Sequence, residues 1–391
     1  MIPIALGVFV VSLIGALMVF ILYPFAIFLI SRLAPSPWTR SDTLEPTVTL
    51  VIAARNAAPL IEEKLHNISE LDYPTNKLDV VFFVDGSDDD TADLIRKYAS
   101  ERIRVYDDPE HKGKISALNR AATKAKGEIL VFNDADSILS TNAIRKLVRH
   151  FADARIGGVC GQRVIYREQT DLRYAQERYI RFDSTLKMFE SSVGSVASND
   201  GKIYCIRRQL FRPIADAVTD DLFVCLTVVE QGFRFVFDPE AHAHVRVPSR
   251  SARHEIERRR RIVCRSLRGI LSKWRLANPF AYGPFAFSLI FNRVMRRILP
   301  LFLLGLLVSS AMLGATYPAI RVFFLAQLVF YCVAISYPAL HSQRSNGSLL
   351  EKLHSMAFYF VIGSVGTLLG IFDYLRGRRI TRWTPRKTGA A

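Results

Sequence analysis

The feature that most restricts the fold of this chain is a long N-terminal stretch without charge. Residues 4–30 contain no Asp, Glu, Lys or Arg, and as a helix with a rise of about 1.5 Å per residue they could cross a bilayer core of about 30 Å. Three more apolar stretches follow late in the chain, at Ile298–Ile320, Val322–Leu340 and Ser355–Phe372. We therefore expect four membrane spans, one within residues 1–31 and about three within residues 298–374, around a soluble middle.

The positive charge of the chain is concentrated in two blocks. The net charge is +16, and its densest parts are Arg250–Arg275 and Arg376–Lys387, both close to apolar stretches. Anionic lipid head groups are therefore nearer partners than a nucleic acid, and the blocks lack the interleaved aromatic residues of a nucleic-acid-binding surface. The five cysteines show no paired spacing, so the sequence indicates neither a zinc site nor a disulfide framework, as expected in a reducing cytosol.

The distribution of basic residues also predicts an orientation. Arg32 and Arg40 follow the first apolar stretch, so the positive-inside rule places the N-terminus outside and the soluble domain, residues 45–275, in the cytosol of a bacterial-type inner or plasma membrane. Three later spans would put the basic tail, residues 375–391, outside, against the same rule. Either one C-terminal stretch does not cross, or an additional one, within Pro279–Phe291, does.

Residues 276–297 separate the soluble domain from the later spans. Their pattern predicts an amphipathic helix in the membrane interface, with Arg293, Arg296 and Arg297 directed toward lipid phosphates. The alternative, the cytosolic start of the next span, differs little from this in sequence.

The middle of the chain alternates between apolar, β-branched runs and helical patterns. We expect strands at 47–54, 78–84, 102–106 and 129–132, with helices at 57–70, 91–98 and 115–126 between them. This alternation is typical of a doubly wound α/β fold with a parallel sheet, in which ligands bind at the carboxyl ends of the strands. Beyond residue 136 the pattern weakens, and we expect helices at 172–189 and 221–231 and a strand at 201–207.

Two carboxylates, Asp134 and Asp136, follow the fourth predicted strand. A pair of hard oxygen ligands can hold a divalent cation, which in turn can hold a diphosphate. An isolated Asp-x-Asp is more often a turn or a helix cap. Here it stands in a series of motifs, which are Asp85–Thr91, Lys112–Asn119, Asp134–Asp136, Thr219–Asp221 and the arginine run Arg258–Arg261.

These motifs, in this order between Thr47 and Arg268, resemble the membrane-embedded family-2 glycosyltransferases, the group that includes poly-N-acetylglucosamine, hyaluronan, cellulose and chitin-oligosaccharide synthases. The resemblance implies a GT-A-like nucleotide-sugar domain inserted between transmembrane helices. It implies inverting transfer from a UDP-sugar donor to a growing or lipid-linked β-glycan acceptor, with Mg²⁺ or Mn²⁺ as cofactor. Accessory or export subunits, or a homo-oligomer, are further partners that such enzymes suggest.

The resemblance also implies roles for donor-side residues. Asp85, in a segment like the family's Asp-Gly-Ser-Thr-Asp-Gly-Thr, would face the uracil, and Ala54 would lie beside the nucleotide. Lys112 and Lys114, in a segment like Gly-Lys-x-x-Ala-Leu-Asn, would close on the phosphates, where a flexible cation suits the charge. Asp134 would contact the donor and, with Asp136, hold the metal.

On the acceptor side, Thr219–Asp221 resembles the family's Thr-Glu-Asp motif, so Asp221 would be the general base and Asp220 would lie near the acceptor, or cap a helix. The run from Arg258 to Ile262 stands where chain-building members carry Gln-x-x-Arg-Trp. Arg261 would bind the diphosphate and Arg258 would lie by the acceptor. Ile262 replaces the tryptophan that stacks on the acceptor sugar, which puts long-chain synthesis in doubt.

Other readings remain open from the sequence. Another aromatic side chain, Trp274 or Tyr204, could replace the missing stacking surface. Without one, the chain could add a single sugar to a polyprenyl or other lipid carrier. A catalytically silent subunit that binds UDP-sugars is a third reading, although such a subunit would not need a base at Asp221.

Overall fold

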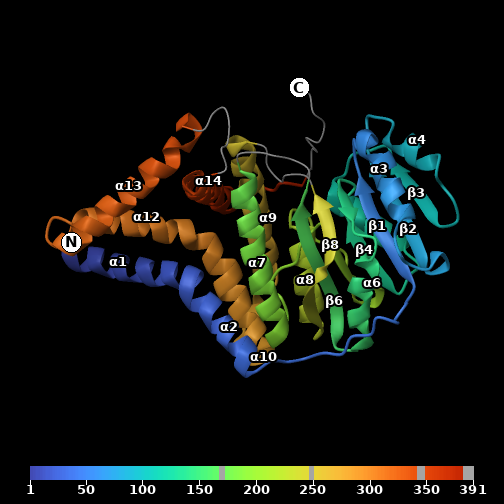
Figure 1. Ribbon diagram of the computed structural model, residues 1–391, viewed down its shortest axis with the longest axis horizontal. Coiled ribbons are helices and arrows are strands. Elements are labelled where there is room, and N and C mark those ends of the chain that lie inside the picture. Colours follow the sequence, from blue (N-terminus) through green and yellow to red (C-terminus); the bar gives the residue numbers. More distant parts are fainter. Residues whose placement is uncertain (167–171, 246–250, 341–347, 382–391) are drawn as a thin grey trace.

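The chain folds into an α/β domain from which a group of long helices extends (Figure 1). The computed structural model describes residues 1–166, 172–245, 251–340 and 348–381. Most of the predicted basic tail, residues 382–391, lies outside the described residues.

The centre of the domain is an eight-stranded sheet in the order β3-β2-β1-β4-β7-β6-β8-β5 within the described ranges. The strands are β1 (Val48–Ala54), β2 (Leu78–Asp85), β3 (Ile103–Asp108), β4 (Ile129–Asn133), β5 (Ser137–Leu139), β6 (Ile156–Ile165), β7 (Ile203–Arg207) and β8 (Arg234–Val245). Strands β3, β2, β1 and β4 are parallel, which confirms the predicted doubly wound half. Strand β7 then pairs antiparallel with β4, and β6 antiparallel with β7, so the complete sheet is mixed.

Helices cover both faces of this sheet. They are α3 (Ala58–Ser69), α4 (Thr91–Arg96), α5 (Lys114–Lys124), α6 (Ala143–Val148), α7 (Arg173–Val193), α8 (Asp220–Glu230) and α9 (Ala252–Ser272), with short helical turns η2 (Thr75–Lys77), η3 (Arg149–Ala152), η4 (Arg208–Leu210) and η5 (Trp274–Ala277). One hydrophobic core lies on the face of α5 and α8, and a second on the face of α3 and α6. Strand β1 is buried along its whole length, as its continuous apolar sequence predicts for a parallel strand covered on both faces.

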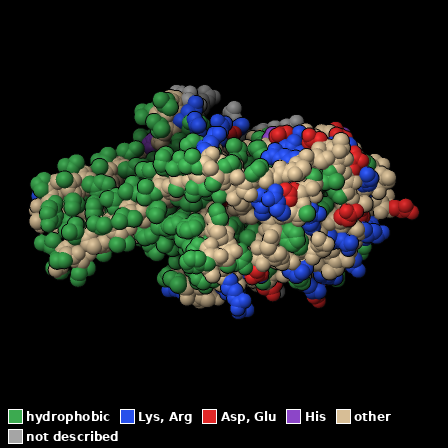
Figure 2. Space-filling model, turned by 90° about the horizontal axis from the view of Figure 1, so that it is seen from below, with side chains coloured by type: hydrophobic (Ala, Val, Ile, Leu, Met, Phe, Trp, Pro, Cys, Tyr) green, Lys and Arg blue, Asp and Glu red, His purple; other side chains and the backbone are tan. Residues whose placement is uncertain are grey.

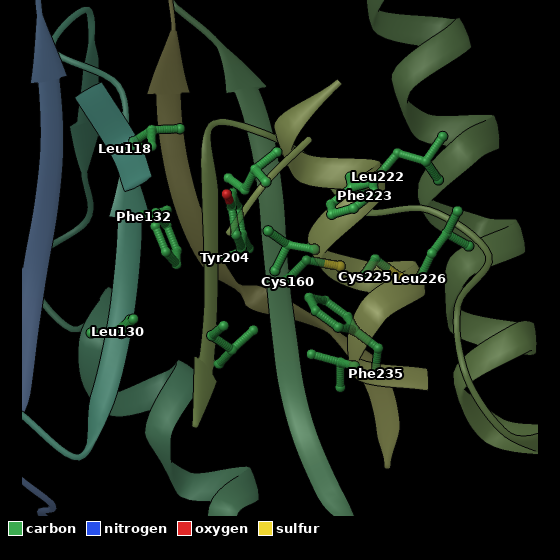
Figure 3. Packing of buried hydrophobic residues seen from close by; sticks show 14 of the residues in the cluster. Leu118, Leu130, Phe132, Cys160, Tyr204, Leu222, Phe223, Cys225, Leu226 and Phe235 are labelled. Atoms are coloured by element: carbon green, nitrogen blue, oxygen red, sulfur yellow. The ribbon is translucent and has the colours of Figure 1, made fainter. Parts of the chain in front are cut away.

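Tyr204 belongs to the first of these cores. Its ring stacks on Phe132, with centroids 4.7 Å apart, and the surrounding side chains come from β6, β8 and α8 (Figure 3). Because the Tyr204 side chain is completely buried, it cannot be a stacking surface for a sugar, and that alternative is wrong. The alternation of residues in the sequence could not show that Tyr204 is buried, since this depends on the packing of α8 in the same core.

Four helical stretches are long and apolar enough to cross a membrane. They are Ile2–Leu33, formed by α1 (Ile2–Leu17), η1 (Met18–Leu22) and α2 (Tyr23–Leu33); Pro284–Leu313, formed by α11 (Pro284–Phe287), η6 (Ser288–Met295) and α12 (Arg296–Leu313); α13 (Pro318–Leu340); and α14 (Leu349–Leu375). Three of the predicted apolar stretches lie within these helices. The fourth, Ile298–Ile320, was predicted too long, because α12 ends at Leu313 and α13 begins at Pro318. Figure 2 shows hydrophobic side chains over the extended helices, and charged side chains gathered over the α/β domain.

Residues 276–297 do not form a single separate helix. They include η5, the short helix α10 (Pro279–Tyr282), and the first part of the stretch that continues into α12. The expected contacts of its arginines with lipid phosphates are wrong, because these arginines bind the domain. Arg293 and Arg296 approach Asp183 of α7 at 3.5 and 3.1 Å, and Arg297 donates to the Ser266 hydroxyl of α9 at 2.7 Å.

Glu190 joins the long helices to the domain. This side chain of α7 is almost fully buried, and its Oε1 accepts hydrogen bonds from the Tyr23 hydroxyl of α2 at 2.6 Å and from Asn292 of η6 at 2.7 Å. Its Oε2 accepts from the backbone N–H of Ala197 at 3.0 Å. One carboxylate therefore connects two of the apolar stretches with a loop that leads into the sheet.

Candidate active site

The candidate site lies at the carboxyl edge of the parallel strands. Strands β2, β1 and β4 are neighbours in the sheet and parallel, so Asp85, Ala54 and Asp134 follow one another along the same edge. Ala54 is the buried last residue of β1. This is the edge at which a doubly wound fold of the predicted kind binds its ligands.

The Asp134–Asp136 turn is bound by two lysine ammonium groups. Lys202 Nζ lies 2.8 Å from Asp134 Oδ2 and 2.9 Å from Asp136 Oδ1. Lys114 Nζ lies 2.9 Å from both Asp134 Oδ1 and Asp220 Oδ2. Burial alone would lower the pKa of each lysine, but the neighbouring carboxylates outweigh it and raise both above the ordinary value. Both lysines therefore remain charged and balance the acidic cluster.

A buried polar network supports this turn from below. Lys64 of α3 is fully buried and donates to the Asn133 side chain and, at 2.7 Å, to the Ser137 carbonyl oxygen. The Asn133 amide in turn donates to the Ser137 hydroxyl and to the Lys202 carbonyl oxygen, both at 2.6 Å. The residues before and after the two aspartates are thereby held, which fixes the direction of the carboxylates.

Asp220 and Asp221 begin α8, beside the same lysine. Asp220 is bound to Lys114, whereas Asp221 Oδ1 accepts from the backbone N–H of Leu222 at 2.7 Å. Burial, and then the negative charge of Asp220, raise the pKa of Asp221 to about 6. A side chain at Gly201 would start 3.3 Å from Asp221 Oδ2, so the glycine keeps the space in front of this carboxylate open.

Asp85 and Lys112 have partners of their own. The Asp85 carboxylate accepts from the backbone N–H groups of Lys112 and Gly113, at 2.9 and 2.8 Å, and its Oδ2 lies 2.8 Å from His111 Nδ1. Lys112 is half exposed and directs its ammonium to Asp108 at 3.1 Å. The structure therefore unites Lys114 with the acidic cluster and leaves the Lys112 side chain outside it.

The arginine run lies on α9, next to the start of α8. Arg265 Nε donates to the Val218 carbonyl oxygen at 2.7 Å, which fixes α9 just before the Thr219–Asp221 motif. Burial, and then the charges of Arg265 and Arg258, lower the pKa of Arg261. Arg258 binds Glu255 at 3.0 Å, and the Ile262 side chain is 37% exposed, so α9 presents positive charge and a small apolar surface. An anion near Arg261 would relieve the repulsion among these guanidinium groups.

Three site residues escaped the sequence analysis: Lys202, Lys64 and Asn133. Lys202 reaches the aspartates because β4 and β7 pair antiparallel, with Asn133 opposite Ile203. That long-range pairing leaves no local pattern in the sequence. Lys64 could have been suspected, since a lysine on the apolar side of a predicted helix needs a buried partner.

Comparisons with known proteins agree with this geometry. The family model described as glycosyl transferase family 2 matches residues 49–213. Over 214 residues the chain is 27% identical to a poly-beta-1,6-N-acetyl-D-glucosamine synthase of Staphylococcus aureus, covering 53% of this chain and 51% of that protein. It is 26% identical over 220 residues to the probable glycosyltransferase YdaM of Bacillus subtilis, covering 52% and 51%. The chain thus spans about half the length of the curated relatives it matches.

A solved structure shares the fold over nearly the whole chain. The mannosyltransferase PcManGT from Pyrobaculum calidifontis, solved in complex with GDP-Man and Mn²⁺, superimposes with a TM-score of 0.69 at 24% identity. The match covers 94% of this chain and 98% of that one, so it includes the long helices as well as the sheet. Residues 49–213 thus match the glycosyl transferase family 2 model, and the fold is GT-A-like, with helices long and apolar enough to cross a membrane on both sides of this region.

Proposed function

We propose that this protein is an inverting, metal-dependent glycosyltransferase that moves a sugar from a UDP-sugar to a growing or lipid-linked β-glycan at the membrane. The observation that carries the proposal is the meeting of Lys114, Asp134 and Asp220 at the carboxyl edge of the sheet, next to the partly buried Asp221. The comparisons support a nucleotide-diphosphate sugar as donor, since one relative is named as the synthase of a β-linked N-acetylglucosamine polymer and the Pyrobaculum structure contains GDP-Man and Mn²⁺. The choice of a UDP-sugar follows from the resemblance at Asp85. The positive-inside pattern of Arg32 and Arg40 supports a cytosolic domain.

The Asp134–Asp136 turn fits a divalent cation. Its carboxylate oxygens are hard ligands of the type that Mg²⁺ and Mn²⁺ prefer, and their two ammonium partners, with which a cation would compete, show that they attract positive charge. When bound, the cation would neutralise negative charge that develops on the departing diphosphate. Asp85 and Ala54 would border the nucleoside, and Lys114 and Arg261 would bind phosphate oxygens.

Asp221 suits the role of general base. A carboxylate whose pKa is raised to about 6 is still largely ionised at neutral pH, and it is a stronger base than an ordinary aspartate. It would take the proton from the acceptor hydroxyl as this attacks the donor sugar. Asp220, bound to Lys114, would link the acceptor side to the phosphate-binding lysine.

The test separates these two sides of the site. Asp221→Asn should lower the transfer rate by about 10²-fold or more, the usual contribution of a general base, while the affinity for the UDP-sugar stays near that of the native protein. Asp136→Asn should abolish transfer and weaken UDP binding only when Mg²⁺ or Mn²⁺ is present. Radiolabelled transfer and calorimetric UDP binding measure both effects. A collapse of donor binding in Asp221→Asn would contradict the base assignment, and full transfer in excess chelator would contradict the metal.

A second candidate, transfer of one or a few sugars to a lipid carrier, is favoured by the acceptor helix. Ile262 stands where an aromatic ring would hold a moving glycan, and Tyr204 is buried, which leaves Trp274 as the exposed alternative. We expect short products from the native protein and longer ones from Ile262→Trp, measured by sizing the glycan. Trp274→Ala is the matched control, because it removes the exposed aromatic ring that remains as an alternative stacking surface. Long polymer from the native protein would exclude this candidate.

A further inference from the structure

The last apolar helix, α14, differs from the other candidate spans in what it packs against. In its most apolar stretch 44% is buried within the protein, compared with 6% for α13. Figure 1 shows α14 nearly end-on beside α7 and α9, whereas α1 and α12 run across the view and away from the domain. Helix α14 is therefore apolar enough to cross a membrane, but it lies along the α/β domain.

The partner of α14 is the arginine-rich helix α9. Next to the midpoint of α14, a side chain at Gly363 would start 3.5 Å from Arg259 Nε, and the Arg259 guanidinium donates to the Tyr359 hydroxyl at 3.1 Å. Further along, Asp373 accepts from Arg260 at 2.6 and 2.7 Å. Gly366 and Gly370 allow this close approach, since a Cβ on either would overlap α9.

This packing conflicts with a membrane-spanning α14. If α14 crossed the bilayer, its midpoint would lie at the centre and would carry Arg259, with its buried partner Glu255, to the same depth. Helix α9 contains seven arginines between residues 253 and 268, and arginine is among the residue types least tolerated at the bilayer centre. Helix α9 must therefore remain outside the hydrocarbon core, and so must the helix packed on it.

The opposite face of α14 is apolar and exposed. It is formed by Leu350, Leu353, Met356, Val365, Phe372 and Leu375, and basic residues including Lys352, Arg376 and Arg378 flank it. One face on protein, one apolar face and flanking cations are the features of a helix that lies in the membrane interface, with its apolar side at the level of the upper acyl chains.

We propose that α14 lies flat on the membrane surface on the side of the catalytic domain, and that only α1–α2, α11–α12 and α13 cross. The occupant of its exposed face is the lipid bilayer. The charge pattern supports this independently: with two C-terminal crossings the chain returns to the side of Arg32 and Arg40, so the basic tail obeys the positive-inside rule. Four spans would have placed the basic tail outside, against this rule, and three spans remove that conflict.

The first arm of the test locates the tail. Single cysteines are introduced as Arg379→Cys after α14, Ser100→Cys in the domain and Ala315→Cys between α12 and α13, in a Cys332→Ser background because the other four native cysteines are buried. Sealed membrane vesicles of one orientation are treated with an impermeant maleimide. The maleimide should label Arg379→Cys in vesicles of the same orientation in which it labels Ser100→Cys. It should label Ala315→Cys only in vesicles of the opposite orientation. Reaction of Arg379→Cys together with Ala315→Cys would overturn the proposal.

The second arm distinguishes a surface α14 from a crossing α14 accompanied by an extra crossing elsewhere. Val365→Lys and Val329→Lys place a lysine at exposed positions near the middle of α14 and α13. The amount of folded, membrane-integrated protein should fall several-fold for Val329→Lys and remain near native for Val365→Lys, since a surface helix can direct the ammonium to water. An equal loss for both variants would overturn the surface placement.

Discussion

At the scale of single residues, Asp221 shows how position alone adapts an ordinary side chain. It lies partly buried at the start of α8, beside Asp220, and both the desolvation and the neighbouring charge disfavour its charged form. The residue nevertheless stays partly exposed, and Gly201 places no side chain against its Oδ2. The residue can therefore hold a proton more strongly than a surface aspartate while still meeting a substrate.

This predicts the pH dependence of transfer. Because the base must be ionised and the pKa of Asp221 is raised to about 6, kcat/KM should fall as the pH drops through about 6, instead of about 4 as for an ordinary aspartate. Asp220→Asn removes the second cause of the shift, so the acidic limb should move to lower pH. The measurement is the pH profile of kcat/KM for both proteins. A native limb near pH 4 would show that Asp221 is not the titrating base.

Lys202 predicts an effect on metal binding. Its ammonium bridges Asp134 and Asp136, so a divalent cation must compete with it for the same oxygens. A hydrogen bond to a charged group contributes about 1.5–3 kcal/mol, which the cation must overcome when it displaces Lys202. In the absence of the nucleotide-sugar, Lys202→Met should therefore tighten Mn²⁺ binding roughly tenfold or more. Titration of free Mn²⁺ by electron paramagnetic resonance measures it.

The control for that prediction is Lys112→Met. Lys112 is near in sequence to Lys114 but directs its ammonium to Asp108, outside the acidic cluster. Its removal should leave Mn²⁺ affinity unchanged. Equal affinities in the native protein and Lys202→Met would mean that Lys202 yields to the cation without cost.

Much of the site was predictable at this scale because its motifs lie at strand ends, where local sequence determines position. Asp134, Asp220 and Lys114 meet as the order of the motifs suggests. The errors concern side chains whose surroundings come from distant segments. Arg293 and Arg296 form ion pairs with Asp183, which lies more than a hundred residues earlier in the chain. Tyr204 is fully buried in the core that includes α8.

At the scale of elements, the strands of the sheet also divide into those set by local sequence and those set by pairing with distant segments. The parallel strands β1 to β4 alternate with helices, so each connection is short and the pattern is visible locally. Strand β6 was not predicted, because it carries mixed residues and pairs with β8 across a long interval of sequence, with register shifts near Cys160. Strand direction in the second half depends on these pairings.

The contact between α9 and α14 predicts a sensitive position. A Cβ at Gly366 would start 2.8 Å from both the Ile256 carbonyl oxygen and Arg259 Cβ, so the helices would have to separate. Gly366→Ala should destabilise the protein by about 1–3 kcal/mol, as overpacking does. Thermal unfolding in detergent micelles measures the change.

The matched control for that substitution is Gly7→Ala in α1, where a Cβ would meet no atom within 4 Å. It should not lower the melting temperature, because alanine favours a helix over glycine. If Gly366→Ala melted like Gly7→Ala, the two helices would not be packed as closely as described.

At the scale of the whole molecule, the buried carboxylate of Glu190 has a practical consequence for anyone who prepares the protein. A fragment trimmed to the α/β domain would lose the hydrogen bonds from Tyr23 and Asn292 and open the packed surface around Glu190 to water, with one backbone donor left. Because a hydrogen bond to a charged group contributes about 1.5–3 kcal/mol, the loss of two is a large share of the stability of a typical domain. Samples for crystallisation or cryo-microscopy should therefore keep the hydrophobic helices and use a lipid nanodisc, since trimming them removes part of the protein's own interior.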